Sequence, residues 1–105
     1  MPDCAVFYSP LSRRDLDEIY DYIAVDLANP ASAAGIVADI LNAADGLASF
    51  PAVGGIVGNV PFLMDEYRFL PVHNYMVFYR WTGSQVFIDR ILYKKRDYAR
   101  LLGLQ

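Results

Sequence analysis

The stretch that decides the fold is residues 65–103. It reads DEYRFLPV (65–72), HN (73–74), YMVFYRW (75–81), TGSQ (82–85) and VFIDRILYKKRDYARLLG (86–103). Three apolar, β-branched and aromatic runs are separated by two short turn signals, which is typical of a three-stranded antiparallel meander. His73-Asn74 tolerates the positive φ of a two-residue hairpin loop, and Gly83-Ser84 suits a second such loop with glycine at its first central position.

The middle run of the meander places alternate side chains on opposite faces of the sheet. One face carries Tyr75, Val77, Tyr79 and Trp81, and the other carries Met76, Phe78 and Arg80. The first face holds more apolar bulk, so we expect helices to cover it. The second face is less polar than a solvated sheet face. We therefore expect a protein partner to cover an exposed apolar surface made of Ile56, Val57, Met76 and Phe78.

Residues upstream of the meander predict a strand and a helix. Ala5–Tyr8 is a short apolar run before Ser9-Pro10. Either Ser12 with Asp15, as a capping box, or Ser9 with Pro10 at the first helical position starts the helix. Its apolar stripe at helical spacing is Leu16, Ile19, Tyr20, Ile23 and Leu27. The charged side chains between these positions are expected to face solvent.

A second helix follows directly, because Asn29-Pro30 ends the first helix and begins the next as N-cap and first residue. Its apolar stripe is Ala33, Val37, Ile40, Leu41, Ala44 and Leu47. The tight joint predicts an antiparallel helical hairpin. Residues 51–64 form a long apolar loop with three glycines and two prolines, and we expect it to pack on the core. Asp97 is expected to cap a short C-terminal helix that ends at Gly103.

Composition describes a single globular domain over residues 1–105. Hydrophobic residues make up 55% of the chain and charged residues 20%, which is typical of a globular protein. No apolar run approaches the roughly 20 residues of a membrane span, and from the N-terminal residues we expect no secretory signal. The single cysteine, Cys4, forms no internal disulfide. We expect a cytoplasmic protein with no membrane contact.

Charge is divided unequally along the chain. The formal net charge is −3, which argues against a general nucleic-acid binder. Residues 1–65 carry two basic and nine acidic side chains, whereas residues 66–105 carry seven basic and three acidic ones. The basic half is therefore suited to an anionic partner. The residues that we predict to bind such a target are Arg68, Arg80, Arg90, Lys94, Lys95 and Arg96.

Motifs of common enzyme classes are missing from the sequence. There is no phosphate-binding loop, no G-x-S-x-G, no C-x-x-C and no H-E-x-x-H. His73 is the only histidine, which excludes a metal site built on histidines, and we expect neither a metal nor a cofactor. Asp15, Asp17 and Asp21 are interpreted as helix-surface carboxylates.

The basic cluster has three interpretations. It binds phosphates or an acidic protein surface, or it cleaves RNA with lysine or arginine stabilising developing charge and tyrosine or lysine moving protons. The third interpretation is ordinary surface charge, with Arg90 paired to Asp89 or Asp97.

The order strand, helical hairpin, meander and short helix resembles the RelE/ParE superfamily of type II toxin–antitoxin toxins. YRFLPVHNYMVFYR (67–80) and IDRILYKKRDY (88–98) resemble its closing signature, and RRDLDEIYDYI (13–23) resembles its helix entry. The resemblance implies an α+β fold with the hairpin packed on a mixed sheet. It also implies a toxin of a plasmid-stabilisation-like system that is neutralised by a cognate antitoxin.

Two branches of this superfamily differ in mechanism. ParE-like members bind DNA gyrase, and RelE-like members cut mRNA in the ribosome. RelE-like enzymes commonly carry an arginine where this chain has Met76, and a late C-terminal tyrosine for which Tyr98 stands too early. Lys95-Arg96 matches their lysine–arginine pair, so Lys95, Arg96 and Tyr98 are the weak catalytic candidates. The resemblance favours the ParE-like branch; the alternatives are a ribosome-dependent endonuclease and a degenerate toxin that only binds its antitoxin.

Overall fold

A computed structural model describes residues 3–57 and 66–95. Its elements are β1 (Ala5–Tyr8), α1 (Pro10–Asp21), a π-helical turn η1 (Tyr22–Asp26), α2 (Pro30–Asp45), a short 3-10 helix η2 (Gly46–Ala48), β2 (Gly55–Ile56), β3 (Glu66–Val72), β4 (Tyr75–Trp81) and β5 (Gln85–Tyr93). The predicted C-terminal helix, and the loop residues 58–64, lie outside the described residues.

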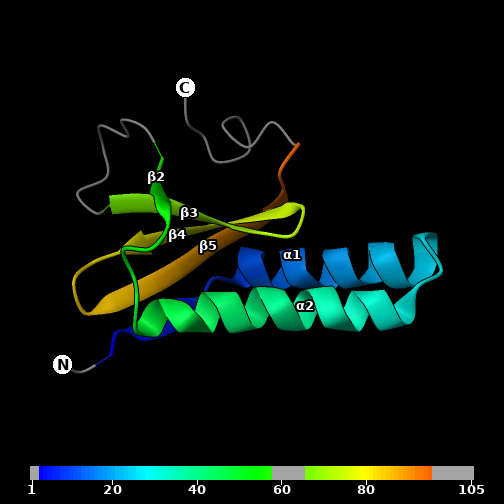
Figure 1. Ribbon diagram of the computed structural model, residues 1–105, viewed down its shortest axis with the longest axis horizontal. Coiled ribbons are helices and arrows are strands. Elements are labelled where there is room, and N and C mark those ends of the chain that lie inside the picture. Colours follow the sequence, from blue (N-terminus) through cyan, green and yellow to red (C-terminus); the bar gives the residue numbers. More distant parts are fainter. Residues whose placement is uncertain (1–2, 58–65, 96–105) are drawn as a thin grey trace.

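The strands form one sheet in the order β1-β5-β4-β3-β2. The meander β3-β4-β5 is antiparallel as predicted, and β1 adds to β5 in parallel, so the sheet is mixed. Helices α1 and α2 lie side by side on one face of the sheet, and their joined ends extend past it (Figure 1). The α+β architecture expected from the sequence is confirmed.

The turns follow from residues that tolerate positive φ. His73 has a φ of 53° between β3 and β4. Gly83 has a φ of 85°, and the Thr82 N–H donates to the Gln85 carbonyl at 2.9 Å. Thr82 therefore faces Gln85, and Gly83 and Ser84 are the two residues of the loop before β5, as predicted. The indole N–H of Trp81 donates to the Gly83 carbonyl at 2.9 Å. This bond ties the end of β4 to the loop.

Side-chain caps begin both helices. Ser9 caps α1, because its hydroxyl accepts the Ser12 N–H at 2.9 Å; the capping box with Asp15 does not form. Asn29 caps α2 by accepting the Ser32 N–H at 3.2 Å. Both caps precede a proline at the first helical position, as sequence predicted.

The apolar stripe of the first helix ends earlier than predicted. Ile19 and Ile23 are buried, but Tyr20 and Leu27 are exposed. The π-helical turn at Tyr22–Asp26 changes the helical spacing before Leu27. This end of the hairpin also extends beyond the sheet (Figure 1), so it has fewer packing partners.

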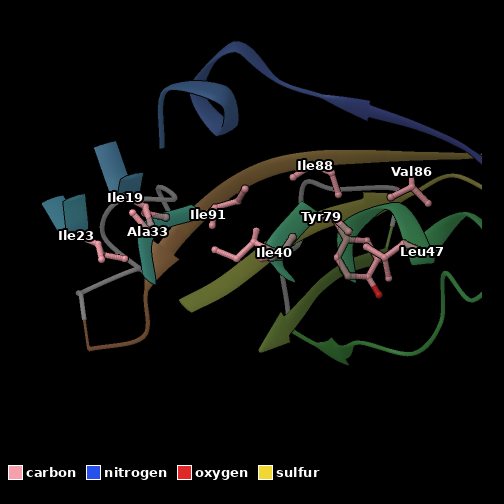
Figure 2. Close-up of a cluster of buried hydrophobic side chains, with 11 residues drawn as sticks. Ile19, Ile23, Ala33, Ile40, Leu47, Tyr79, Val86, Ile88 and Ile91 are labelled. Carbon is pink, nitrogen blue, oxygen red and sulfur yellow. The ribbon is translucent and has the colours of Figure 1, made fainter. Parts of the chain in front are cut away.

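The main core lies between the hairpin and the sheet. Figure 2 shows Ile40 and Leu47 from the helical side beside Tyr79 of β4. At the other end of the same cluster Ile19 lies beside Ile91 of β5. Val77 and Tyr79 are fully buried in this core, which confirms the predicted helix-facing side of β4. The core therefore fixes the sheet register, since a one-residue slip would turn these side chains to the opposite face.

A second, smaller cluster lies on the opposite face of the sheet. It contains Tyr67, Phe78 and Leu92, with Val57 and Met76 packed against it. Phe78 is only 1% exposed. The expectation that Phe78 is part of an exposed surface is therefore wrong: its ring is enclosed by neighbours on this face, including Tyr67 stacked at 6.3 Å.

Candidate functional site

The beginning of α1 covers the edge of β5 where β1 ends. The last β1 residue, Tyr8, pairs with Ile88. Beyond that point Ser9 donates its N–H to the Ile88 carbonyl at 2.9 Å and its hydroxyl to the Asp89 carbonyl at 2.7 Å. The Asp15 carboxylate accepts the Ile91 N–H at 2.9 Å. Ser9, the N-cap of α1, and the Asp15 side chain thus satisfy backbone groups of β5 that lie beyond the end of β1.

Asp15 also binds Arg90 through two hydrogen bonds. Its carboxylate accepts from Nε at 2.8 Å and from Nη2 at 2.9 Å. Asp15 is 5% exposed. The hydrogen bonds that Arg90 donates to Asp15 raise the pKa of Arg90 above its ordinary value, against the opposing effect of burial. Two sequence-based interpretations are therefore corrected: Asp15 is not a surface carboxylate, and Arg90 is paired with Asp15 and not with Asp89. Asp97 lies outside the described residues.

A groove of about 760 Å³ lies beside this ion pair. The groove lies between the part of the helical hairpin within residues 15–36 and residues 90–93 at the end of β5, and the β3–β4 turn forms one wall. Its apolar lining includes Ile19, Ile23 and Ile36, and its polar lining includes Arg90 and His73. His73 Nε2 lies 2.7 Å from the Asp39 carboxylate, which joins this turn to α2.

Three tyrosines line the same groove: Tyr22, Tyr75 and Tyr93. The Tyr75 and Tyr93 rings are tilted against each other at 5.8 Å. Burial, followed by the proximity of Tyr22 and Tyr93, raises the pKa of Tyr75. Tyr22 is 51% exposed and Tyr93 is 40% exposed. Aromatic residues that combine a large apolar ring with a hydroxyl are enriched in protein interfaces.

Arg68 is a structural residue in this fold. Its Nη1 donates to the carbonyls of Ala52 at 3.2 Å and Gly54 at 2.7 Å, and its guanidinium lies 5.8 Å from the Trp81 ring centroid. Tyr79 supports the same loop, because its hydroxyl accepts the Gly54 N–H and donates to the Pro51 carbonyl. Arg68 therefore holds the chain segment that leads into β2.

Arg80 and Arg90 lie close to a buried tyrosine on the helix-free side. Tyr67 donates its hydroxyl to Asp89 at 2.8 Å. Burial and the Asp89 carboxylate raise the pKa of Tyr67, whereas Arg80 and Arg90 act in the opposite direction. Asp89 sits where the β4–β5 register shifts, and this bulge presents its carboxylate to Tyr67.

The predicted basic cluster does not gather into one patch within the described residues. Arg68 pairs in register with Tyr79, on the helix-covered face, whereas Arg80 lies beside Phe87 on the other face. Lys94 and Lys95 form an exposed turn just beyond β5, where Lys94 N–H donates to the Asn74 carbonyl. Arg96 and Tyr98 lie outside the described residues.

The predicted partner-binding residues are placed unevenly. Ile56 is 62% exposed on the two-residue edge strand β2. Val57 and Met76 are partly buried against Tyr67, Phe78 and Leu92. Val53 is also exposed, so the described part of the loop is only partly packed. The expectation that this loop packs on the core is confirmed for Val57 and is wrong for Val53 and Ile56.

Sequence reasoning missed the groove and its principal residues. Tyr22, Tyr75 and Tyr93 belong to three separate elements, and Asp15 binds a residue 75 positions away. One signal pointed to Asp15: it lies one residue before Leu16 in the apolar stripe, near the buried side of the helix.

In the part of the chain that the structure describes, no group of three or more His, Cys, Asp or Glu side chains is arranged to hold a metal, and no helix is long and apolar enough to span a membrane.

Comparisons with known proteins agree with this architecture. The family described as "ParE toxin of type II toxin-antitoxin system, parDE" matches residues 6–98. A solved structure titled "Chromosomal ParDE TA system from P. aeruginosa" is similar, with a TM-score of 0.70 and 26% identity, covering 86% of this chain and 95% of that one. No curated protein matches. The family match spans nearly the whole chain, so this protein belongs to the ParE toxin family of type II toxin–antitoxin systems.

Proposed function

We propose that this toxin-family protein is neutralised in the cytoplasm by a cognate antitoxin and acts by binding its target, with DNA gyrase as the first candidate. The observation that carries the proposal is the match to the ParE family over residues 6–98. The similar ParDE structure supports the antitoxin partner. A binding mechanism requires an accessible surface and no catalytic group.

The groove beside Arg90 is suited to bind a helical segment of the antitoxin. Its apolar lining from Ile19, Ile23 and Ile36 suits the apolar face of an amphipathic helix. Tyr22 and Tyr93 at the same groove add partly exposed aromatic contacts. The edge strand β2, with exposed Ile56 beside Val57 and Met76, is a further proposed antitoxin contact, and the buried Phe78 supports that surface from below.

The turn at Lys94 and Lys95 is the proposed contact with the target. Both side chains are exposed at the end of β5, and Arg96 continues the basic run in sequence. Among the other predicted target-binding residues, Arg80 lies on the helix-free face. Arg68 binds a loop carbonyl and Arg90 binds Asp15. These two arginines therefore have an indirect role, in which they hold the strands in place next to the proposed target contact.

Met76 supports binding over RNA cleavage. It stands where RelE-like enzymes commonly carry an arginine, and a thioether neither stabilises a phosphate charge nor transfers a proton. Its side chain packs with Phe78 and Leu92. A cleavage mechanism would therefore depend on Lys95, Arg96 and Tyr98 alone.

Induced expression in growing cells tests this proposal. The wild-type chain should arrest growth, and co-expression of the antitoxin should restore it. The double variant Lys94→Glu/Lys95→Glu should lose toxicity, whereas Arg13→Glu/Arg14→Glu, which reverses two exposed charges on α1, should retain it. Unimpaired toxicity of the first variant would remove this turn from the target contact. Codon-specific mRNA cleavage by wild type would favour the endonuclease.

A further inference from the structure

A row of three side chains crosses β1, β5 and β4 on the face opposite the helices. Phe7 pairs in register with Phe87, and Phe87 pairs with Arg80. Their sequence neighbours, such as Val6, Val86 and Tyr79, point to the helix-covered core. Because side chains alternate along a strand, Phe7, Phe87 and Arg80 share the helix-free face. We call these three residues the aromatic row.

The aromatic row is stacked. The Phe7 and Phe87 ring centroids are 5.5 Å apart with an interplanar angle of 20°. The Arg80 guanidinium lies 5.1 Å from the Phe87 ring centroid. Since β1 and β4 flank β5, Phe7 and Arg80 approach the Phe87 ring from opposite sides. Phe87 is thus held in place, and Phe7 at the sheet edge remains 47% exposed.

This geometry suits the stacking of unpaired bases. Aromatic side chains held on adjacent strands of an open sheet face are a common way to bind single-stranded nucleic acid. A base–aromatic stack tolerates any base, since every base has a π-face. Phe7 belongs to neither the groove nor the basic turn, so the proposed toxin function leaves its exposure unexplained.

Charge separates the two layers of the molecule. Residues 10–48, which form the helical layer, carry two basic and seven acidic side chains. Residues 66–95, which form β3 to β5 and their turns, carry five basic and two acidic ones. Arg68 and Arg90 are engaged by loop carbonyls and by Asp15, and Lys94 and Lys95 lie beyond the other end of β5. Of these five basic residues, Arg80 is therefore the one that lies at the aromatic row, while the acidic helical layer repels a phosphate backbone. Arg80 adds its positive charge directly beside the rings.

We propose that the aromatic row is a binding site for single-stranded nucleic acid, with a base stacked on Phe7 and phosphates near Arg80. This activity goes beyond the proposed toxin function. Because the whole chain has a net charge of −3, binding is local, weak and strongly reduced by salt. The base stack on Phe7, and not general electrostatic attraction, gives the site its preference for single strands over duplexes.

Fluorescence anisotropy at low salt with a short labelled oligothymidylate tests the site. Phe7→Ala should weaken binding at least about fivefold, the lower limit for loss of one base stack. Phe7→Tyr keeps a ring and should bind like wild type. Phe50→Ala is the matched control, since Phe50 is 70% exposed elsewhere, and it should leave binding unchanged. Circular dichroism confirms that each variant is folded.

Three results would overturn the proposal. These are no saturable binding by wild type, equal binding by Phe7→Ala, and equal or tighter binding of a duplex of the same length. If wild type fails to bind the oligonucleotide but Phe7→Ala loses toxicity, the row contacts a protein. Growth arrest by wild type is scored separately, so failure of this site is distinguishable from failure of the toxin proposal.

Discussion

Asp15 on α1 and Arg90 on β5 form a two-bond ion pair, at 2.8 and 2.9 Å, and the same carboxylate accepts the Ile91 N–H at 2.9 Å. One side chain thus joins a helix to a strand backbone and to a strand side chain. The pair also lines the groove that we assign to the antitoxin. Because the ion pair holds α1 against β5, it determines the shape of one wall of that groove.

Removal of the Asp15 carboxylate should destabilise the fold strongly. Asp15→Ala leaves the Arg90 guanidinium and the Ile91 N–H without their partner, and breaking a buried pair costs roughly 3–5 kcal/mol. Urea denaturation followed by circular dichroism measures this loss. Asp17→Ala removes an exposed carboxylate from the same helix and should change the free energy of unfolding by no more than about 0.5 kcal/mol. Similar midpoints for the two variants would contradict the structural role of the pair.

A methyl group at Gly54 should also be costly. A Cβ there would lie 2.5 Å from the Tyr79 hydroxyl oxygen and 2.6 Å from the Phe69 carbonyl oxygen. Gly54→Ala should lower the free energy of unfolding by about 1–3 kcal/mol, as overpacking does. Gly46→Ala is the control, because nothing lies within 4 Å of its Cβ position and its helical φ of −63° favours a gain of about 0.4–1 kcal/mol. Thermal melts that rank these variants in the opposite order would refute the close packing at Gly54.

The buried tyrosine on the helix-free side predicts a loss of stability at alkaline pH. Burial and Asp89 raise the pKa of Tyr67, so the folded state holds the hydroxyl proton after the unfolded chain releases it near pH ~10. The free energy of unfolding that comes from this raised pKa is fully present below pH ~10. It is lost above that value at up to about 1.4 kcal/mol per pH unit.

Tyr67→Phe removes this titration and should make the alkaline limb less steep; the remaining slope comes from Tyr8 and Tyr75, whose pKa values burial also raises. The stability of this variant at neutral pH is lower because the bond to Asp89 is gone. The measurement is urea denaturation at a series of pH values between neutral and strongly alkaline. Parallel curves for wild type and variant would exclude Tyr67 as a source of the alkaline loss.

The groove predicts where antitoxin affinity is lost. Tyr22 lines the groove, and a charged residue there would be desolvated by the docked helix, so Tyr22→Glu should weaken the complex at least about tenfold. Val25→Glu lies on the same helical turn but is 72% exposed and outside the groove, and it should bind normally. Isothermal titration calorimetry with the antitoxin peptide gives both values. Equal affinities would move the antitoxin away from the groove.

Local patterns allowed most of the fold to be predicted from sequence. The alternation in β4 identified Val77 and Tyr79 as core residues, and Asn29-Pro30 marked the joint of the hairpin. These signals act over a few residues, where strand alternation and helix capping are determined. The parallel pairing of β1 with β5 was not predictable in this way, because it joins distant segments.

The candidate site was less accessible to sequence reasoning. Charge alone suggested that Arg68 and Arg90 face a partner, whereas they bind loop carbonyls and Asp15. A cluster counted along the chain does not say which side of a strand each residue occupies. The burial of Phe78 was not predictable for a similar reason. It depends on the neighbours of Phe78 on adjacent strands, and not on the position of Phe78 within β4.

DNA supercoiling by purified gyrase tests the central claim most directly. The purified protein should inhibit supercoiling, preincubation with its antitoxin should prevent the inhibition, and translated mRNA should stay intact in a parallel reaction. Lys94→Glu/Lys95→Glu should inhibit far less than wild type at equal concentration. Full gyrase activity in the presence of excess folded protein, together with mRNA cleavage in translating ribosomes, would rule out gyrase as the target and favour the endonuclease.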